Sequence, residues 1–379
     1  MIVARALRKA AIVGAALVLV AAAVVVAFLQ HPQFGRLPSG NALHQLEASR
    51  HYWDGIFHNE VDTTIDTDPG TGFVASDGKA RRPATQIPAV KTSIKDLDPN
   101  ADLVIWLGHS SYYVQLAGKR ILIDPVFTDN ASPVWHTNNS FAGTNIYSAD
   151  DFPEIDYLLI SHDHYDHLDY PTVKSLMPKV RHVVAGLGVG SYFRGWGYPA
   201  DKVVDADWRQ IIAADDLEIV VTPARHYSGR LFEKNKTLWV GYVVKSKSRR
   251  LFFSGDSGYG PHFAEIGKQY GPFDWVALDD GQYDRRWANV HMNAEQAGQA
   301  ADDLHAAAFT PGHVGRFSLA PHAWDEPLEQ SEVEAKRRHY ALWTPAIGSP
   351  MYLDGRSQKF GTWWRAPGHV PAPTEASFN

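Results

Sequence analysis

Residues 161–169 read Ser-His-Asp-His-Tyr-Asp-His-Leu-Asp and follow the short apolar run Tyr157–Ile160. Side chains two positions apart in an extended backbone share a face, so His162 and His164 can point the same way. Asp166 and His167 lie just beyond, where we expect the loop to turn into a helix. Imidazole and carboxylate groups this dense are satisfied by a bound cation, and imidazole suits zinc, nickel, copper or iron(II). A single histidine here would be better explained as part of a solvated loop without a metal. Three histidines and an aspartate at this spacing instead favour a metal site.

Short β-rich runs and helical patterns surround this segment. Consecutive strands, then helices, then further strands predict sheets covered by helices. The expected strands are Leu103–Trp106, Tyr112–Leu116, Arg120–Ile123, Tyr157–Ile160, His182–Val184, Glu218–Thr222, Leu238–Val244 and Leu251–Ser254; the expected helices are Tyr170–Leu176, Ala294–Leu304 and Glu326–Arg338.

Composition narrows the chemistry. The chain of 379 residues has no cysteine, so disulfides, thiolate catalysis and Cys-ligated zinc are excluded, and any metal must be held by carboxylates and the 18 histidines. The net charge is −6 although the first 30 residues are basic, so the remainder is more acidic still. Phosphate backbones need clustered Lys and Arg, and we therefore expect no nucleic-acid partner. The sequence does not indicate an oligomeric state.

The N-terminus has the features of a membrane segment. Ala11–Leu29 is an uninterrupted run of apolar and small residues, long enough to cross about one hydrocarbon core. Arg5, Arg8 and Lys9 precede it, so the positive-inside rule places everything after Leu29 outside the cytoplasm. We expect a membrane anchor with a periplasmic or otherwise extracytoplasmic domain. The alternative is a signal segment, cleaved near the small residues Ala21–Ala23, and a secreted protein.

Four regions follow from these patterns. We expect an anchor or signal segment at residues 1–30, an extended prefix wrapping the domain at 31–100, a catalytic domain at 101–350 and a C-terminal tail at 351–379. Loops are expected near Asp66–Gly72 and Arg81–Pro88, and poor order from Pro367 onward, where prolines gather.

The His-x-His-x-Asp-His segment resembles the signature of the metallo-β-lactamase superfamily. Three later segments, each at the end of an expected strand, resemble that family's remaining motifs: Thr222-Pro223-Ala224-Arg225-His226, Ser254-Gly255-Asp256-Ser257-Gly258 and Pro311-Gly312-His313. The resemblance implies a four-layer αββα sandwich. It also implies two divalent metal ions, with zinc expected. His162, His164 and His226 would hold one, Asp166, His167 and His313 the other, and Asp256 would bridge them.

Further motifs resemble one branch of that superfamily, which includes L-ascorbate-6-phosphate lactonase and the N-acylphosphatidylethanolamine-hydrolysing phospholipase D. They are Trp106-Leu107-Gly108-His109-Ser110-Ser111, Gly281-Gln282-Tyr283 with Arg286-Trp287, His291-Met292-Asn293 and His322-Ala323-Trp324. Asp279-Asp280 before the Gly-Gln-Tyr segment and Val314 after the last ligand depart from the phospholipase pattern, so lipid specificity does not carry over from the resemblance.

The resemblance implies a hydrolase whose metal-bridging hydroxide, oriented by Asp166 and Asp256, attacks a small-molecule or lipid substrate. We expect a phosphodiesterase of phospholipase D type. The alternatives are a lactone or carboxyl-ester hydrolase on the same metals and a membrane-tethered binding protein without turnover. His322 is the candidate general acid. Substrate contacts are expected from Tyr283, Arg286, His291 and His109. The histidines His109, His291 and His322 could instead support the metal ligands, and each of these side chains could also be purely structural.

Overall fold

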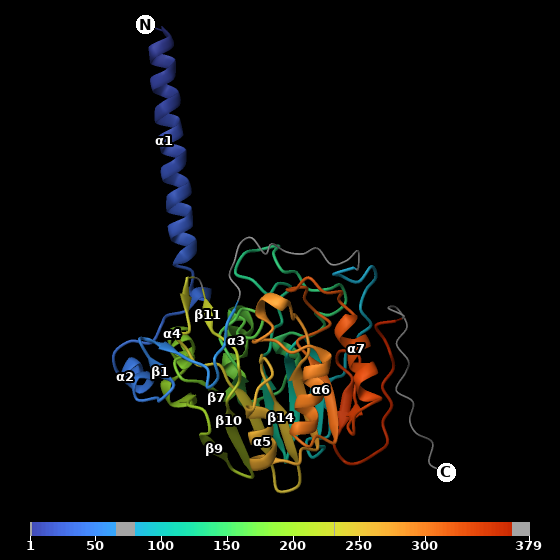
Figure 1. Cartoon of the computed structure of the whole chain (residues 1–379). Coiled ribbons are helices and arrows are strands. Elements are labelled where there is room, and N and C mark those ends of the chain that lie inside the picture. The colour runs from blue at the N-terminus through green and yellow to red at the C-terminus, as the bar shows by residue number, and fades with distance from the viewer. Residues whose placement is uncertain (1, 66–79, 231, 366–379) are drawn as a thin grey trace.

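The structure, a computed structural model, describes residues 2–65, 80–230 and 232–365. Two large mixed sheets pack face to face, and helices cover their outer faces (Figure 1). The loop expected near Asp66–Gly72 and the stretch from Pro367 onward lie outside the described residues. Within them, the four-layer αββα sandwich predicted from the sequence is confirmed.

The first sheet has seven strands among the described residues. In spatial order they are β18 (Pro350–Tyr352), β3 (Leu103–Gly108), β4 (Ser111–Leu116), β5 (Lys119–Ile123), β6 (Ile155–Ile160), β7 (Val180–Gly186) and β8 (Val203–Ala206). Strands β5 to β8 are parallel, and β3 runs in the same direction because β4 is antiparallel to both β3 and β5. The carboxyl ends of β3, β5 and β6 therefore share one edge.

The second sheet also has seven described strands. Their order is β17 (Ala341–Leu342), β16 (Ala308–Gly312), β15 (Trp275–Asp279), β14 (Arg250–Phe253), β13 (Gly241–Lys245), β10 (Leu217–Thr222) and β9 (Ile211–Ala214). Strands β14, β15 and β16 are parallel, and β10 shares their direction because β13 is antiparallel to both β10 and β14. Four carboxyl ends again meet at one edge.

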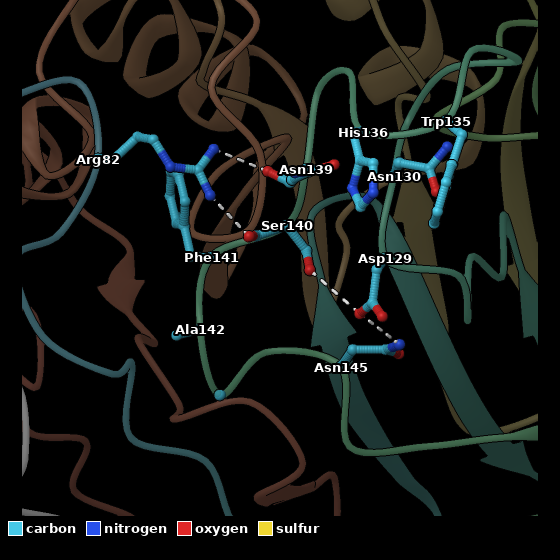
Figure 2. A pocket seen from close by; sticks show the side chains of 11 residues that line it. Arg82, Asp129, Asn130, Trp135, His136, Asn139, Ser140, Phe141, Ala142 and Asn145 are labelled. Atoms are coloured by element: carbon cyan, nitrogen blue, oxygen red, sulfur yellow. Dashed lines mark hydrogen bonds between the residues drawn. The ribbon is translucent and has the colours of Figure 1, made fainter.

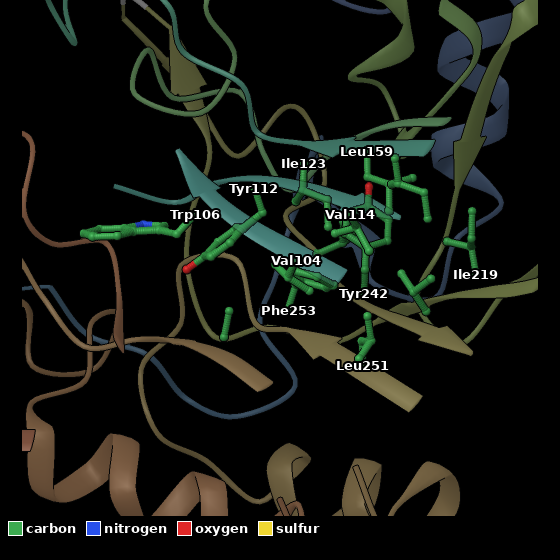
Figure 3. Close-up of a cluster of buried hydrophobic side chains, with 14 of the residues drawn as sticks. Val104, Trp106, Tyr112, Val114, Ile123, Leu159, Ile219, Tyr242, Leu251 and Phe253 are labelled. Carbon is green, nitrogen blue, oxygen red and sulfur yellow. The ribbon is translucent and has the colours of Figure 1, made fainter. Parts of the chain in front are cut away.

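Strand alternation explains why the central strands are apolar throughout. In β3, Val104 and Trp106 enter the core between the sheets, whereas Leu103, Ile105 and Leu107 face the outer helices. Figure 3 shows the inter-sheet core, where Tyr112 and Val114 of the first sheet meet Tyr242 and Phe253 of the second. Both faces of each sheet are covered, so the strands read as continuous apolar runs.

Short helices supply the outer layers. On the first sheet lie α3 (Tyr170–Leu176) and α4 (Gly190–Gly195), and on the second lie α5 (His262–Tyr270) and α6 (Ala294–Asp303), with α7 (Glu326–Ala335) packed on α6. Asn293 caps α6 by accepting from the backbone N–H of Gln296. The N-terminal part adds α2 (Asn41–Glu47) and the hairpin of β1 (Tyr52–Trp53) and β2 (Ile56–Phe57).

The chain begins with α1 (Ile2–Leu29), which projects away from the domain (Figure 1). Within Ala4–Leu29, the most apolar window of 18 residues has a mean hydropathy of 3.0, and none of that window is buried in the domain. Length and composition would let it cross a membrane, and a signal sequence would share these features. A single 3-10 turn, Pro32–Phe34, joins α1 to the domain.

Two sequence-based boundaries differ from the structure. The strand expected at Leu238–Val244 begins only at Gly241, because the N–H groups of Leu238 and Val240 donate to Leu187 and Ser161 of the first sheet's loops. The tail expected from residue 351 starts inside β18, where fully buried Met351 pairs with Val104. Trp363 and Trp364 are buried as well, so residues 350–365 complete the core rather than trail from it.

Candidate metal centre

The seven predicted ligands come together at the shared edge of the two sheets. His162 to His167 follow β6, His226 follows β10, Asp256 follows β14 and His313 follows β16. The carboxyl ends of these strands converge, so loops more than 150 residues apart in the chain place their side chains within reach of one another. His313 and Gly255 have φ of 61° and 60°, backbone turns that aim the ends of these loops inward.

The first half-site consists of His162, His164 and His226. His162 Nε2 lies 2.8 Å from His164 Nδ1, and His226 Nε2 lies 3.3 Å from the same atom. Two nitrogens bound at about 2.0–2.1 Å to one tetrahedral ion would be about 3.3 Å apart, so this spacing fits a shared cation. The three nitrogens and a carboxylate oxygen of Asp256 all lie within 4.8 Å of one another.

The second half-site consists of Asp166, His167 and His313. His313 Nε2 lies 3.2 Å from Asp166 Oδ2, and His167 Nε2 lies 3.6 Å from the same oxygen. Asp256 Oδ2 lies 3.1 Å from His167 Nε2 and 3.3 Å from His313 Nε2, and 3.8 Å from Nε2 of both His162 and His226. Asp256 thus lies between the half-sites, where a bridging ligand would be.

Three of the five histidines have a hydrogen-bond partner on their second ring nitrogen, and that of a fourth, His313, lies beside a carboxylate without a hydrogen bond to it. Nδ1 of His162 contacts Ser161 Oγ at 2.9 Å, and Nδ1 of His226 contacts the Val290 carbonyl at 3.0 Å. Nδ1 of His167 lies 2.8 Å from Asp124 Oδ2, and Nδ1 of His313 lies 3.4 Å from Asp279 Oδ1. Such partners fix the tautomer and the ring orientation, so each Nε2 is directed to the centre.

Asp124 and Asp279 were not singled out from the sequence. Both are buried and directly end a strand, β5 and β15. Asp124 also accepts from the N–H and hydroxyl of Ser161, and Asp279 accepts from the N–H of Ser257. Each is a positioning residue behind a histidine of the second half-site. Their place at strand ends was the available signal, but nothing in the sequence pairs them with a particular histidine.

The donor set fits divalent cations. His167 Nε2 and Asp256 Oδ1 are buried and have no hydrogen-bond partner, a costly arrangement that a cation would relieve. Burial alone would raise the pKa of Asp256, but the neighbouring His167 and His313 outweigh burial and hold it well below its usual range. A carboxylate at this position stays ionised and can offset positive charge.

Two additional histidines flank the ligands. His109 is completely buried, and its Nε2 lies 2.9 Å from Asp166 Oδ2, so it supports a predicted ligand, one of the two functional roles expected for it, and does not face a substrate space. His291 Nδ1 lies 2.8 Å from Asp279 Oδ2, and its ring lies 5.0 Å from that of His226 and 4.9 Å from that of His313. His291 therefore lies beside both half-sites.

The remaining predicted residues lie outside the cluster. Tyr283 donates to Glu326 at 3.0 Å, and Arg286 Nε donates to Asp284 at 2.6 Å. His322 stacks on Tyr283 at 4.5 Å with its Nδ1 2.7 Å from the Ala323 carbonyl. Burial lowers the pKa of His322. If Nδ1 donates to that carbonyl, Nε2 of the neutral ring carries a lone pair, which suits accepting a proton more than donating one.

A cleft of about 530 Å³ opens elsewhere in the domain (Figure 2). Arg82 donates to the carbonyls of Asn139 and Ser140 on its wall, and Trp135 and His136 stack at 3.9 Å on its rim. None of the seven predicted ligands lines this cleft. The volume of this cleft does not by itself indicate a reaction. The His/Asp cluster remains the candidate active site.

Residues 119–314 match the family model of the beta-lactamase superfamily domain, more than half of the chain. The chain belongs to the beta-lactamase superfamily. A Mycobacterium tuberculosis relative described as uncharacterized is 35% identical and covers 84% of this chain and 88% of its own length. Solved structures agree on the fold: a metallo hydrolase of Ignicoccus hospitalis has 19% identity and a TM-score of 0.51, covering 66% of this chain and 97% of its own.

Relatives within the superfamily carry hydrolase names. The N-acyl-phosphatidylethanolamine-hydrolyzing phospholipase D 1 of Caenorhabditis elegans is 35% identical and covers 56% of this chain and 64% of its own length. A metal-dependent hydrolase of Caldivirga maquilingensis is 27% identical and covers 65% and 96%. With the His/Asp groups able to bind metal, this superfamily member is a metal-dependent hydrolase.

Proposed function

We propose that this enzyme is a two-metal phosphodiesterase of phospholipase D type that acts on a phospholipid of the membrane into which α1 inserts. The proposal assigns the seven predicted ligands their roles in the two half-sites and zinc as the metal. It places the domain on the extracytoplasmic side, because the basic residues of α1 precede its apolar run. The phospholipase D relatives support the reaction class.

One observation supports a membrane substrate: the turn Pro32–Phe34 at the end of α1, called here the foot of α1, packs against the predicted metal-binding loop, residues 162–167. Phe34, five residues after Leu29 at the end of α1, packs edge-on against Tyr165, with the ring centroids 6.4 Å apart. Tyr165 lies between His164 and Asp166. A helix that crosses a bilayer would therefore hold the metal loop beneath the lipid headgroups, where a phosphodiester substrate is concentrated.

Arg230 fixes this arrangement. Its guanidinium donates to the Gln33 carbonyl through Nε and Nη2 at 3.1 and 2.6 Å, and to the carbonyls of Asp163 and Leu168 through Nη1 at 2.7 and 2.8 Å. It also lies 4.0 Å from the Tyr165 ring. One buried cation thus joins the foot of α1 to both ends of the metal loop.

The chain's own groups prepare the site for hydrolysis. Two divalent cations, when bound, would supply Lewis acidity toward a phosphoryl oxygen and lower the pKa of water toward about 7. Asp166 and Asp256 would offset the added charge, and His109 keeps the Asp166 carboxylate in place. Asp124 holds His167 in one tautomer, and Asp279 places a negative charge beside His313 Nδ1. His291, beside both half-sites, is the histidine best placed to meet a substrate oxygen.

Substrate choice tests the proposal. The full chain in phosphatidylethanolamine-containing vesicles should release phosphatidic acid, and it should cleave a chromogenic phosphodiester, with about two zinc ions per chain. A lactone and a chromogenic carboxyl ester serve as the alternative substrates. Hydrolysis of these without phosphodiester cleavage by the metal-loaded enzyme would overturn the proposal in favour of an ester hydrolase.

A further inference from the structure

Two exposed aromatic side chains stand out on the domain. Outside α1, the most exposed large hydrophobic residues described are Phe232 at 85% and Trp135 at 78%, whereas the next, Ile211, is 56% exposed. Trp135 follows Val134, itself 47% exposed. Phe232 lies between β11 (Gly229–Arg230) and β12 (Glu233–Lys234), which pair as a hairpin. A single exposed apolar side chain is normal on a protein surface, so the position of these two residues relative to α1 decides what they can contact.

Both segments are tied to the same residue at the foot of α1. Gln33 Nε2 donates to the carbonyl of Pro133 at 3.2 Å, two residues before Trp135. Arg230, two residues before Phe232, donates to the Gln33 carbonyl. Figure 1 shows β11 beside the point where α1 enters the domain. The two aromatic residues therefore belong to loops that flank the foot of α1, although they are about 100 positions apart in sequence.

The expected distance of these loops from the bilayer depends on where the apolar run of α1 ends. Leu29 is the last residue of α1, and Gln33 follows four positions later in a 3-10 turn. If the four residues after Leu29 rise about 2 Å each, Gln33 lies about 8 Å beyond the hydrocarbon edge. The headgroup layer is about 5–8 Å thick on each side of a bilayer. Loops bound to Gln33 would then lie at the outer boundary of the headgroup layer.

We infer that Trp135 and Phe232 form a lipid-binding collar around the foot of α1 and insert into the headgroup region of the bilayer. This inference rests on the membrane anchoring in the proposed function. Tryptophan is enriched at membrane interfaces because its ring is apolar and its N–H can remain hydrated. With α1 as one attachment and the collar as two more, the domain has a fixed orientation on the lipid surface, and the metal loop beneath Phe34 faces it.

Tryptophan quenching tests the collar directly. The chain has 12 tryptophans and none in residues 1–30, so quenching by lipid bromine reports on the domain and not on α1. The full chain is reconstituted in phosphatidylcholine vesicles whose acyl chains carry bromine near the carbonyl end or near the methyl end. We expect quenching by the first lipid, and Trp135→Phe should remove most of it. Trp53→Phe is the matched control, since Trp53 is 48% exposed, and should leave it intact.

A second variant reports on the hairpin. Phe232→Trp, added to Trp135→Phe, should restore quenching by lipid brominated near the carbonyl end. Quenching unchanged by Trp135→Phe, or no recovery with Phe232→Trp, would overturn the inference. So would Trp135 emission that responds to protein density in the vesicle and not to bromine, because that result identifies a second copy of this chain as the occupant.

The collar and the enzyme activity can fail separately. Cleavage of a water-soluble phosphodiester should be equal in the wild type and in the Trp135→Phe variant, and bromine quenching should persist in the inactive Asp256→Ala variant. If the wild-type chain cleaves the phosphodiester but shows no bromine quenching, only the collar is refuted. If the metal-loaded wild-type chain shows quenching but no phosphodiester cleavage, only the proposed function is refuted.

Discussion

The two half-sites of the metal centre are supported differently. In the first half-site, the orienting partners of His162 and His226 are a serine hydroxyl and a backbone carbonyl, and His164 is only partly buried. In the second half-site, His167 and His313 are backed by buried carboxylates. A carboxylate partner makes an imidazole more basic and a better ligand. The second half-site should therefore bind its cation more tightly, and the first should be the more adaptable one that faces substrate.

Removing Asp256, the proposed bridging ligand, should have the largest effect because it affects both half-sites. Asp256 lies within 4 Å of histidine nitrogens of both half-sites, so Asp256→Ala should weaken both. A loss of about 4 kcal/mol of transition-state stabilisation corresponds to a fall in kcat of about 10³-fold. Steady-state kinetics with elemental analysis measures this. Asp216→Ala, an exposed carboxylate paired with Lys247, is the control and should be fully active. Turnover retained by Asp256→Ala would disprove the bridging role.

Asp124→Asn should affect the half-sites unequally. It replaces the carboxylate behind His167 but keeps an oxygen for the Ser161 N–H. Loss of such a partner costs about 10–100-fold in metal affinity or activity. Titration with a chelator should show one of the two ions released earlier than in the wild type. If both ions leave together with unchanged affinity, the carboxylate does not set the stronger half-site.

Ser161→Ala should lower the metal affinity of the first half-site by less than Asp124→Asn lowers that of the second. It removes the hydroxyl that contacts His162 Nδ1, one hydrogen bond worth about 0.5–1.5 kcal/mol. Metal affinity should fall by roughly two- to tenfold. The same hydroxyl donates to Asp124, so a fall equal to that of Asp124→Asn would mean that the two half-sites are oriented as one unit.

Tyr283→Phe should change activity least. Its hydroxyl is bonded to Glu326 and has no described contact with either half-site. We expect kcat and KM for a soluble phosphodiester to stay within about twofold, with a stability loss of about 1 kcal/mol from the missing hydrogen bond. A large rise in KM would instead support the substrate contact expected from the sequence, and thermal unfolding would separate that result from a folding defect.

The sequence singled out side chains that the structure brings together because each follows a recognisable strand. His162, His226, Asp256 and His313 are the first histidine or aspartate residues after strands whose carboxyl ends converge in this fold. Most strands of the central core were predicted for the same reason, but the buried strand β15 and the edge strand β8 were not. Helix α5 and strand β9 were also missed, since α5 has a short apolar pattern and Ile211 of β9 is exposed.

Residues that act through another residue could not be predicted. Asp124 and Asp279 acquire a role only because β5 and β15 lie beside the strands that carry the histidines, which is a property of strand order. The same holds for His109, whose buried contact with Asp166 depends on a backbone bridge between His109 and Val314. Met351 was placed in a tail because a three-residue strand leaves almost no periodic signal.

The short 3-10 turn after α1 has a consequence for reach. Gln33, four residues past Leu29, already forms hydrogen bonds with the domain. If α1 crosses a membrane, as proposed, no flexible linker therefore separates the domain from the bilayer. The domain could then rotate about the axis of α1 and diffuse laterally in the bilayer, but it could not move away from the membrane surface or reach an opposing membrane. Its encounters would be two-dimensional and confined to the leaflet it sits on, so turnover should follow the surface density of substrate in that leaflet rather than the bulk concentration.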